Sequence, residues 1–125
     1  MKFLNNKPLL NSVIYVFVLL LIIEIVARMY DLYFQIYWLD FVTHFLGGLL
    51  IFLALKLIFP KINLFYSFLS IFLISVVWEV LELILGNTNL YFSGYGLDTT
   101  FDFIFAFIGA IAGIYIYELI EKSNS

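Results

Sequence analysis

Four long apolar runs constrain the fold of this chain more than any other feature of its sequence. They cover roughly residues 9–30, 39–59, 64–85 and 99–120 of a chain of 125 residues. Each run has about the 20 residues that a helix needs to cross the hydrocarbon core of a bilayer. The sequence therefore predicts a single all-α membrane domain over residues 1–125, in which four transmembrane helices form one bundle.

The composition agrees with a membrane protein and argues against other classes. Hydrophobic residues make up 65% of the chain and charged residues only 12%, whereas a soluble domain carries about 45–50% apolar and about 25% charged residues. The absence of cysteine excludes a disulfide scaffold and a thiolate metal site. The basic residues form no cluster of the kind that nucleic-acid binders carry, so we expect no nucleic-acid partner.

The basic residues also predict how the bundle is oriented. On one side of a four-pass topology lie five lysines: Lys2, Lys7, Lys56, Lys61 and Lys122. The other side carries only Arg28. Because cytoplasmic loops carry the excess of basic residues, we expect both termini in the cytoplasm and the chain in the plasma or inner membrane. The loops Asp31–Trp38 and Asn87–Leu97 then face outward, with their aromatic residues in the interfacial belts.

Apart from Lys56 and Glu118 near the cytoplasmic ends, the ionisable side chains within the predicted helices gather near the outer ends of those helices. In chain order, they are Glu24 and Arg28, Asp40 and His44, Glu79 and Glu82, and Asp98 and Asp102. A spacing of three or four residues places each pair on one helix face. Ionisable groups inside a membrane face the bundle interior or a water-filled cavity, because their exposure to lipid is costly. We therefore expect an acidic chamber that opens to the outer side.

Several of these residues also have a purely structural interpretation. Asp40 and Asp98 lie at predicted helix starts, where an acid caps free N–H groups and suits the helix dipole. Glu24 and Arg28 are spaced for a salt bridge, and a lone histidine such as His44 is often a hydrogen-bonded core residue. Three acids lie a turn or more inside their helices and are the hardest to explain structurally: Glu79, Glu82 and Asp102.

Glycines mark two places where the helices are expected to pack closely. The spacing Gly109-x-x-x-Gly113 is the pattern of small residues that lets one membrane helix approach another. Gly47 and Gly48 lie one turn after the histidine, and we expect both to do the same for the second helix. These contacts would bring the polar pairs of neighbouring helices together.

The order of these motifs resembles a known family. The matching pattern is Asp40-x-x-x-His44-Phe45-x-Gly47-Gly48, then Trp78-Glu79-x-x-Glu82, then Asp98-Thr99-x-x-Asp102, then Gly109-Ala110-x-x-Gly113. It resembles the VanZ-like and YjdF-like small integral membrane proteins, which implies a helical bundle and little defined chemistry. The VanZ-like branch is associated with resistance to teicoplanin, which acts on cell-wall precursors. Glu82 and Ala106 replace the glutamine and asparagine that are usual in that branch, and the preceding loop lacks its arginine. These departures favour the YjdF-like branch.

One functional hypothesis is metal-dependent chemistry on a lipid-linked phosphate. Carboxylates suit a divalent ion such as Mg²⁺ or Mn²⁺, and an imidazole admits Zn²⁺, which could be held against a phosphate. The candidate metal ligands are Asp40, His44, Glu79, Glu82, Asp98 and Asp102. The candidate catalytic residues are Glu79, Glu82 and His44, and the candidate substrate-binding residues are Arg28 and Glu24.

Two alternatives without catalysis stay open. In the first, the chamber binds or shields a lipid head group or a cell-envelope precursor, alone or as a subunit of a larger assembly. In the second, the bundle is an ion or proton pathway. The inner halves of the helices carry almost no polar residues beyond Ser67, Ser70 and Ser75, so a pathway would require an oligomer.

Overall fold

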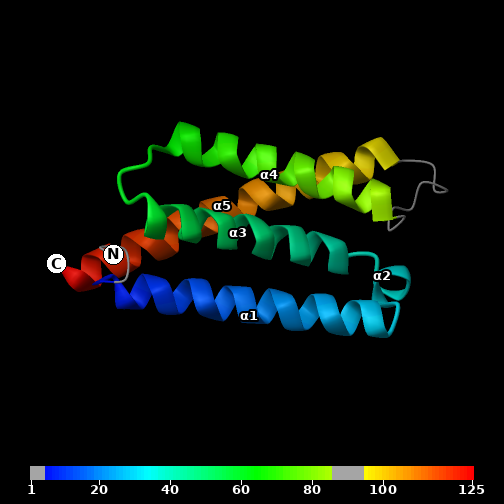
Figure 1. The fold of residues 1–125 in the computed structure, drawn as a ribbon, viewed down its shortest axis with the longest axis horizontal. Helices are drawn as coiled ribbons and strands as arrows, with labels where there is room; N and C mark the ends of the chain where they lie inside the picture. The colour runs from blue at the N-terminus through cyan, green and yellow to red at the C-terminus, as the bar shows by residue number, and fades with distance from the viewer. Residues whose placement is uncertain (1–4, 86–94) are drawn as a thin grey trace.

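The computed structural model describes residues 5–85 and 95–125, except for the side chains of residues 85 and 95–98. Four long helices run antiparallel to their neighbours along the chain (Figure 1): α1 (Lys7–Met29), α3 (Leu39–Ile58), α4 (Leu64–Leu85) and α5 (Tyr95–Asn124). A short helix, α2 (Leu32–Gln35), lies between α1 and α3. All four long helices are long and apolar enough to cross a membrane. The prediction of an all-α bundle with four spans is confirmed.

Helix boundaries differ from the predicted ones mainly in α5, which begins at Tyr95 rather than at 99 and continues to Asn124 rather than 120. The apolar run marks only the part of a helix that lipid can cover, and polar residues such as glutamate and lysine extend the helix beyond it. The turn into α2 was not predicted either. There, Asp31 adopts a left-handed φ of 52°, which reverses the chain after α1.

The outside of the bundle is apolar, whereas several polar side chains lie inside it. Tyr15, Phe17 and Ile22 of α1 are all more than half exposed. Thr43 and Ser67, by contrast, are buried. Such a continuous apolar surface marks contact with a membrane, and helices satisfy their own backbone groups, as lipid requires. The chain is therefore a multi-pass membrane protein.

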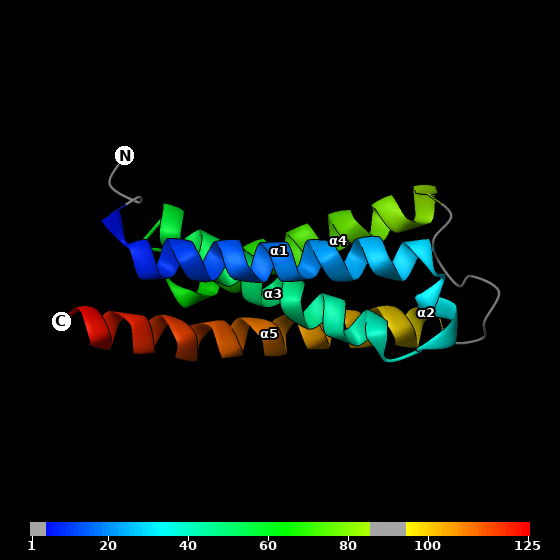
Figure 2. The ribbon, with the colours of Figure 1, turned by 90° about the horizontal axis from the view of Figure 1, so that it is seen from below.

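The helices α3 and α5 form the centre of the bundle and lie side by side in both views (Figure 2). A Cβ atom added to Gly48 would overlap the backbone of Ala106, and one added to Gly109 would overlap the carbonyl group of Phe45. At Gly113, an added Cβ would lie 2.8 Å from the Phe52 ring. The close packing predicted for the Gly109-x-x-x-Gly113 motif is confirmed. We call this contact the α3–α5 seam.

The helices α1 and α4 lie on opposite sides of α3 (Figure 1). Among the described side chains of α4, only every fourth one is buried, in a stripe of Ser67, Ile71, Ser75 and Glu79. Beside this stripe, the rings of Phe72 and Phe103 have centroids 5.3 Å apart, and those of Phe68 and Phe107 are 5.7 Å apart. The attachment of α4 to the seam is therefore narrow, and three of its four buried side chains are polar.

The start of α1 and the end of α5 lie at one end of the bundle (Figure 1). At that end, Asn6 donates a hydrogen bond of 3.1 Å to Glu121, which joins the start of α1 to the end of α5. Lys7 begins α1, and Lys56 and Lys122 lie in the last turns of α3 and α5, so these lysines share one end, as predicted. The α1–α3 connection marks the opposite end, which we call the far end.

Candidate metal centre

His44 is the centre of a polar cluster near the far end of the bundle. Its side chain is buried, and its Nε2 atom lies 3.5 Å from Oδ1 of Asp40, one turn earlier on α3. The same Nε2 lies 3.5 Å from Oδ2 of Asp102 on α5. The seam sets this register, because Gly48 touches Ala106 one turn further along both helices. Close helix packing therefore brings an imidazole and a carboxylate together across two helices.

Glu79 reaches the same cluster from α4. The ligand atoms of His44, Glu79 and Asp102 all lie within 4.8 Å of one another, and all three residues are buried. Glu79 is only 7% exposed. Its Oε2 atom accepts a hydrogen bond of 3.4 Å from the hydroxyl of Thr99, while its buried Oε1 has no hydrogen-bond partner among the described residues. We call His44, Glu79 and Asp102 the buried triad.

A second group of ligand atoms adjoins the buried triad. Those of Asp40, His44 and Glu82 also lie within 4.8 Å of one another, with both acids half-buried. Glu82 additionally accepts a hydrogen bond of 2.9 Å from the indole Nε1 of Trp78. The N-cap of α3 is Trp38, without a side-chain cap, so Asp40 faces His44 rather than capping the helix. We call Asp40, His44 and Glu82 the outer triad.

Glu24 and Arg28 form a separate arrangement at the far end of α1. Arg28 Nε donates a 3.2 Å hydrogen bond to Glu24, which is the predicted salt bridge. Tyr33 of α2 donates a hydrogen bond of 2.7 Å to the other carboxylate oxygen of Glu24. Burial, followed by this bond, raises the pKa of the Tyr33 hydroxyl. From the sequence, Tyr33 was expected only in the aromatic belt. Its contact with Glu24 was missed, because nothing in the sequence shows that α2 folds back toward α1.

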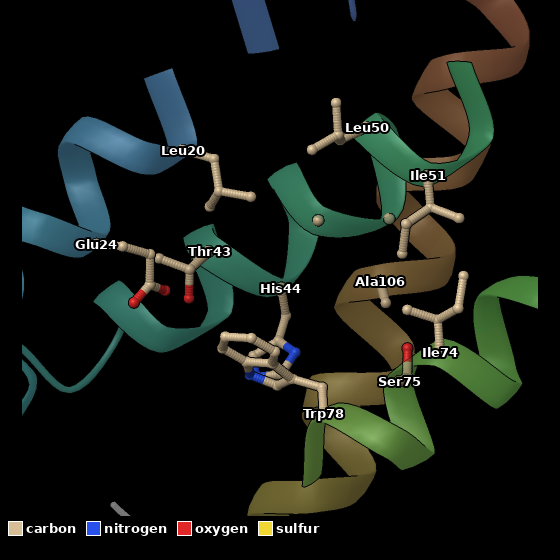
Figure 3. Close-up of a pocket in the computed structure, with 12 residues that line it drawn as sticks. Leu20, Glu24, Thr43, His44, Leu50, Ile51, Ile74, Ser75, Trp78 and Ala106 are labelled. Carbon is tan, nitrogen blue, oxygen red and sulfur yellow. The ribbon is translucent and has the colours of Figure 1, made fainter. Parts of the chain in front are cut away.

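A cavity of about 200 Å³ lies beside His44, between α1, α3 and α4 (Figure 3). Leu20 and Glu24 line it from α1, and Ile74 and Trp78 line it from α4. Its lining is mostly apolar, and it is partly open. His44 thus belongs both to the two triads and to the wall of an apolar cavity.

Gly47 also lines this cavity, which corrects one prediction. We expected Gly47 and Gly48 both to pack against a neighbouring helix. A Cβ added to Gly48 would overlap α5, but one added to Gly47 would meet nothing within 4 Å. Successive residues of an α-helix point about 100° apart. Gly48 therefore faces the seam while Gly47 faces the cavity.

Asp98 is the one predicted ligand whose side chain lies outside the described residues. It does not begin its helix, since α5 starts three residues earlier, at Tyr95. A role for Asp98 in the chamber stays a prediction. The other predicted ligands are brought together in the two triads, whereas Glu24 and Arg28 belong to neither triad.

Comparison with known proteins identifies the family of the chain. A family model described as a predicted membrane protein, DUF2238, matches residues 2–123. The chain belongs to the DUF2238 family. No curated protein and no solved structure matches it. The DUF2238 match agrees with the four membrane-spanning helices, and the chemistry of the cluster follows from its geometry alone.

In this DUF2238 member, the spacing of the buried triad suits a metal ion. Within this triad, the 3.5 Å separation of His44 Nε2 from Asp102 Oδ2 is longer than the usual N–H···O hydrogen bond of about 2.9–3.0 Å. Two ligand atoms bound at about 2.1 Å to a tetrahedral Zn²⁺ lie about 3.4 Å apart. Three protein ligands also leave coordination positions open for water or a substrate. Without a cation or bound protons, the crowded carboxylates would repel one another at low dielectric.

Proposed function

We propose that this protein binds a divalent metal ion at His44, Glu79 and Asp102 and uses it to hold the phosphate of a membrane lipid. One observation carries the proposal: α3, α4 and α5 each contribute one buried ligand atom, and the three atoms lie within 4.8 Å of one another. Buried carboxylates are costly unless they are paired or coordinate a metal. A cation would offset that cost and join α4 to the seam.

The mixture of ligand types selects among metals. Mg²⁺ and Ca²⁺ prefer sites made only of oxygen atoms, whereas an imidazole nitrogen favours transition metals and Zn²⁺. Of the three ions predicted from the sequence, we therefore propose Zn²⁺ or Mn²⁺. The buried triad offers one nitrogen and two carboxylate ligands.

The depth of the site supports a lipid phosphate as its ligand. His44 lies five residues from the start of α3, and Glu79 six residues from the end of α4, which places both roughly 8–9 Å below the far end of their helices. This is the region beneath the lipid head groups. Arg28 is also at the far end, where its side chain is 44% exposed and keeps donors free of Glu24 for a phosphate.

Elemental analysis of the purified protein tests the metal site. We expect about one equivalent of Zn²⁺ or Mn²⁺ after incubation with either ion, and loss of that metal in Asp102→Asn and Glu79→Gln. Glu118→Gln is the matched control, since Glu118 is an exposed acid on the same helix as Asp102 and near its other end. Wild-type protein that takes up neither metal, or an Asp102→Asn variant that binds it equally well, would overturn the proposal.

A second candidate function is hydrolysis of the bound lipid phosphate, and the outer triad favours it. Glu82 lies within ligand distance of His44, so its carboxylate could accept a proton from a metal-activated water. The water oxygen would bond to phosphorus, the bond from phosphorus to the lipid oxygen would break, and that oxygen would take up the proton. Released phosphate, measured with phosphatidic acid as the substrate, tests this function.

The expected result is phosphate release by the wild type and its loss in Glu82→Gln, with metal content unchanged. If the wild type binds metal and phosphatidic acid but releases no phosphate, the non-catalytic binding or shielding function stands instead. The ion-pathway alternative gains no support from the inner halves of the helices. There, Ser67 and Ser70 donate hydrogen bonds to backbone oxygens of Asn63 and Tyr66 on their own segment.

We also propose how the chain is oriented in the membrane and which protein families it is related to. We place the chain in the plasma membrane with the far end outside and relate it to the VanZ-like and YjdF-like proteins, whose motif residues His44, Glu79 and Asp102 converge here. Because the chain has no cysteine, single-cysteine variants can report its orientation. In intact cells, a membrane-impermeant maleimide should label Gln35→Cys but not Ser125→Cys, and the reverse pattern would contradict this orientation.

A further inference from the structure

We infer that the cavity between α1 and α4 seats one hydrocarbon chain of the lipid whose phosphate binds at the buried triad. This inference rests on the proposed function and adds the part of the substrate that lies within the membrane. His44 belongs to both places, as a member of the triad and as part of the cavity wall. A ligand that filled both would need a polar end and an apolar end.

Gly47 lines the cavity without packing against another helix. Glycine inside a helix costs roughly 0.5–1 kcal/mol relative to alanine, so its presence asks for a structural reason. Packing supplies that reason at Gly48, where an added Cβ would overlap Ala106. At Gly47 no neighbour lies within 4 Å of an added Cβ. The absence of a side chain at position 47 therefore leaves space in the wall of the cavity.

The arrangement of the walls indicates how a chain would lie. Glu24 and His44 line the cavity near the far end, and Leu50 and Ile51 extend it along α3 toward the middle of the helix (Figure 3). Ser75 adds one hydroxyl group from α4 beside Ile74. From His44 to Ile51 the helix rises roughly 10 Å. The cavity therefore continues from the depth of the triad toward the membrane interior, which is the path of an acyl chain below its head group.

The size and surroundings of the cavity favour a hydrocarbon occupant. An apolar cavity of about 150 Å³ stays free of water and admits a molecule as large as benzene. This cavity is larger, at about 200 Å³, and it is partly open. Its volume suits part of one chain rather than a pair of chains.

Trp78 allows a direct test, because it lines the cavity. The chain contains two tryptophans, so a Trp38→Phe background leaves Trp78 as the only indole. Phosphatidic acid with bromine atoms on its acyl chains quenches tryptophan fluorescence on contact. We would titrate it into protein held in a detergent without bromine, with unbrominated phosphatidic acid as the reference. Saturable quenching is the expected result.

Gly47→Leu is the decisive variant, since Gly47 lines the cavity and a Cβ atom added there would meet nothing within 4 Å. We expect it to raise the lipid concentration for half-maximal quenching at least tenfold while metal content stays unchanged. Gly47→Ala adds one methyl group and should cause a much smaller shift. Quenching that is equal in Gly47→Leu and its parent, or that never saturates, would overturn the inference.

A different lipid separates this inference from the proposed function. Brominated diacylglycerol has the chains but no phosphate, so its quenching should depend on Gly47 and not on Asp102. If no metal binds but Gly47→Leu still prevents saturable quenching, the metal proposal fails and the chain site stands. If metal binds but Gly47→Leu has no effect on either lipid, the chain site fails alone.

Discussion

The two sides of α3 use the same residue type for opposite purposes. On one side, Gly48 lets the backbone of α5 approach until an added methyl group would overlap Ala106. On the other side, the adjacent Gly47 faces a cavity and touches no neighbour. The seam therefore holds the bundle together, whereas the helices are incompletely packed on the cavity side. Binding sites are commonly found in regions that packing leaves incomplete.

The helix α4 belongs to the incompletely packed side. Its buried stripe consists largely of small or polar side chains, and Glu79 is the one that reaches the seam near the far end. Van der Waals packing and interhelical hydrogen bonds are what associate helices in lipid, and α4 offers a narrow contact for either. A ligand that joins Glu79 to His44 and Asp102 would therefore change the attachment of α4 more than that of α3 or α5.

The largest expected effect contrasts the two glycines directly. Gly48→Val should destabilise the bundle by about 3 kcal/mol or more, because backbone atoms of α5 would have to move. Gly47→Val should change the free energy of unfolding by less than about 1 kcal/mol, since its side chain enters open space. Unfolding in mixed micelles of dodecyl maltoside and increasing sodium dodecyl sulfate measures both variants. Equal destabilisation by the two variants would contradict the different surroundings of Gly47 and Gly48.

Metal removal should have the next largest effect, and it should act on one side of the molecule. A ligand at 100 times its dissociation constant stabilises the folded state by about 2.7 kcal/mol. Chelation should remove that stabilisation and speed amide hydrogen exchange in α4 more than in α3 or α5, because Glu79 is the proposed ligand from the loosely held helix. Chelation of Asp102→Asn, which lacks one proposed ligand, is the control and should change neither quantity. Uniform acceleration in all helices would contradict a metal that joins α4 to the seam.

The sequence predicted the spans and most of the cluster because polar residues are conspicuous in an apolar helix. His44, Glu79 and Asp102 could be assigned to the interior, since a membrane excludes ionisable groups from its lipid-facing surfaces. Gly47 could not be placed in the same way. In a helix that is apolar all around, hydrophobic periodicity does not distinguish the protein-facing side from the lipid-facing side. Only the packing of α3 on α5 shows that Gly48, and not Gly47, meets the neighbour.

The contact of Tyr33 with Glu24 was missed for a related reason. It depends on the left-handed turn at Asp31 and on the short helix α2. The four residues of α2 have mixed polarity, and they give no pattern from which a helix could be predicted. Interfacial tyrosines are common in membrane proteins, so the sequence favoured a belt position over a specific partner. The geometry of the loop, rather than its composition, brings Tyr33 of α2 to Glu24 of α1, which lines the cavity.

The smallest expected effect concerns this α1 wall. Tyr33→Phe should lower the stability of the bundle by about 1 kcal/mol at pH 8, because the variant leaves one carboxylate oxygen of Glu24 without its 2.7 Å hydrogen bond. Unfolding of the two proteins in the same mixed micelles measures the difference. Arg28 still pairs with the other oxygen of Glu24 in the variant, so the loss stays small.

The pH dependence of this difference identifies its cause. Burial and the bond to Glu24 raise the pKa of Tyr33 in the folded protein, while a tyrosine in the unfolded chain ionises near pH 10. The stabilisation is therefore complete below pH 10 and decreases as the pH rises toward the pKa of the folded state. Wild type should keep its advantage over Tyr33→Phe from pH 8 to about pH 10 and should lose it progressively as the pH rises further. The remaining tyrosines titrate in both proteins and cancel. An advantage that stayed constant over this range would mean that Tyr33 keeps α2 on α1 through ring packing, without help from its hydroxyl.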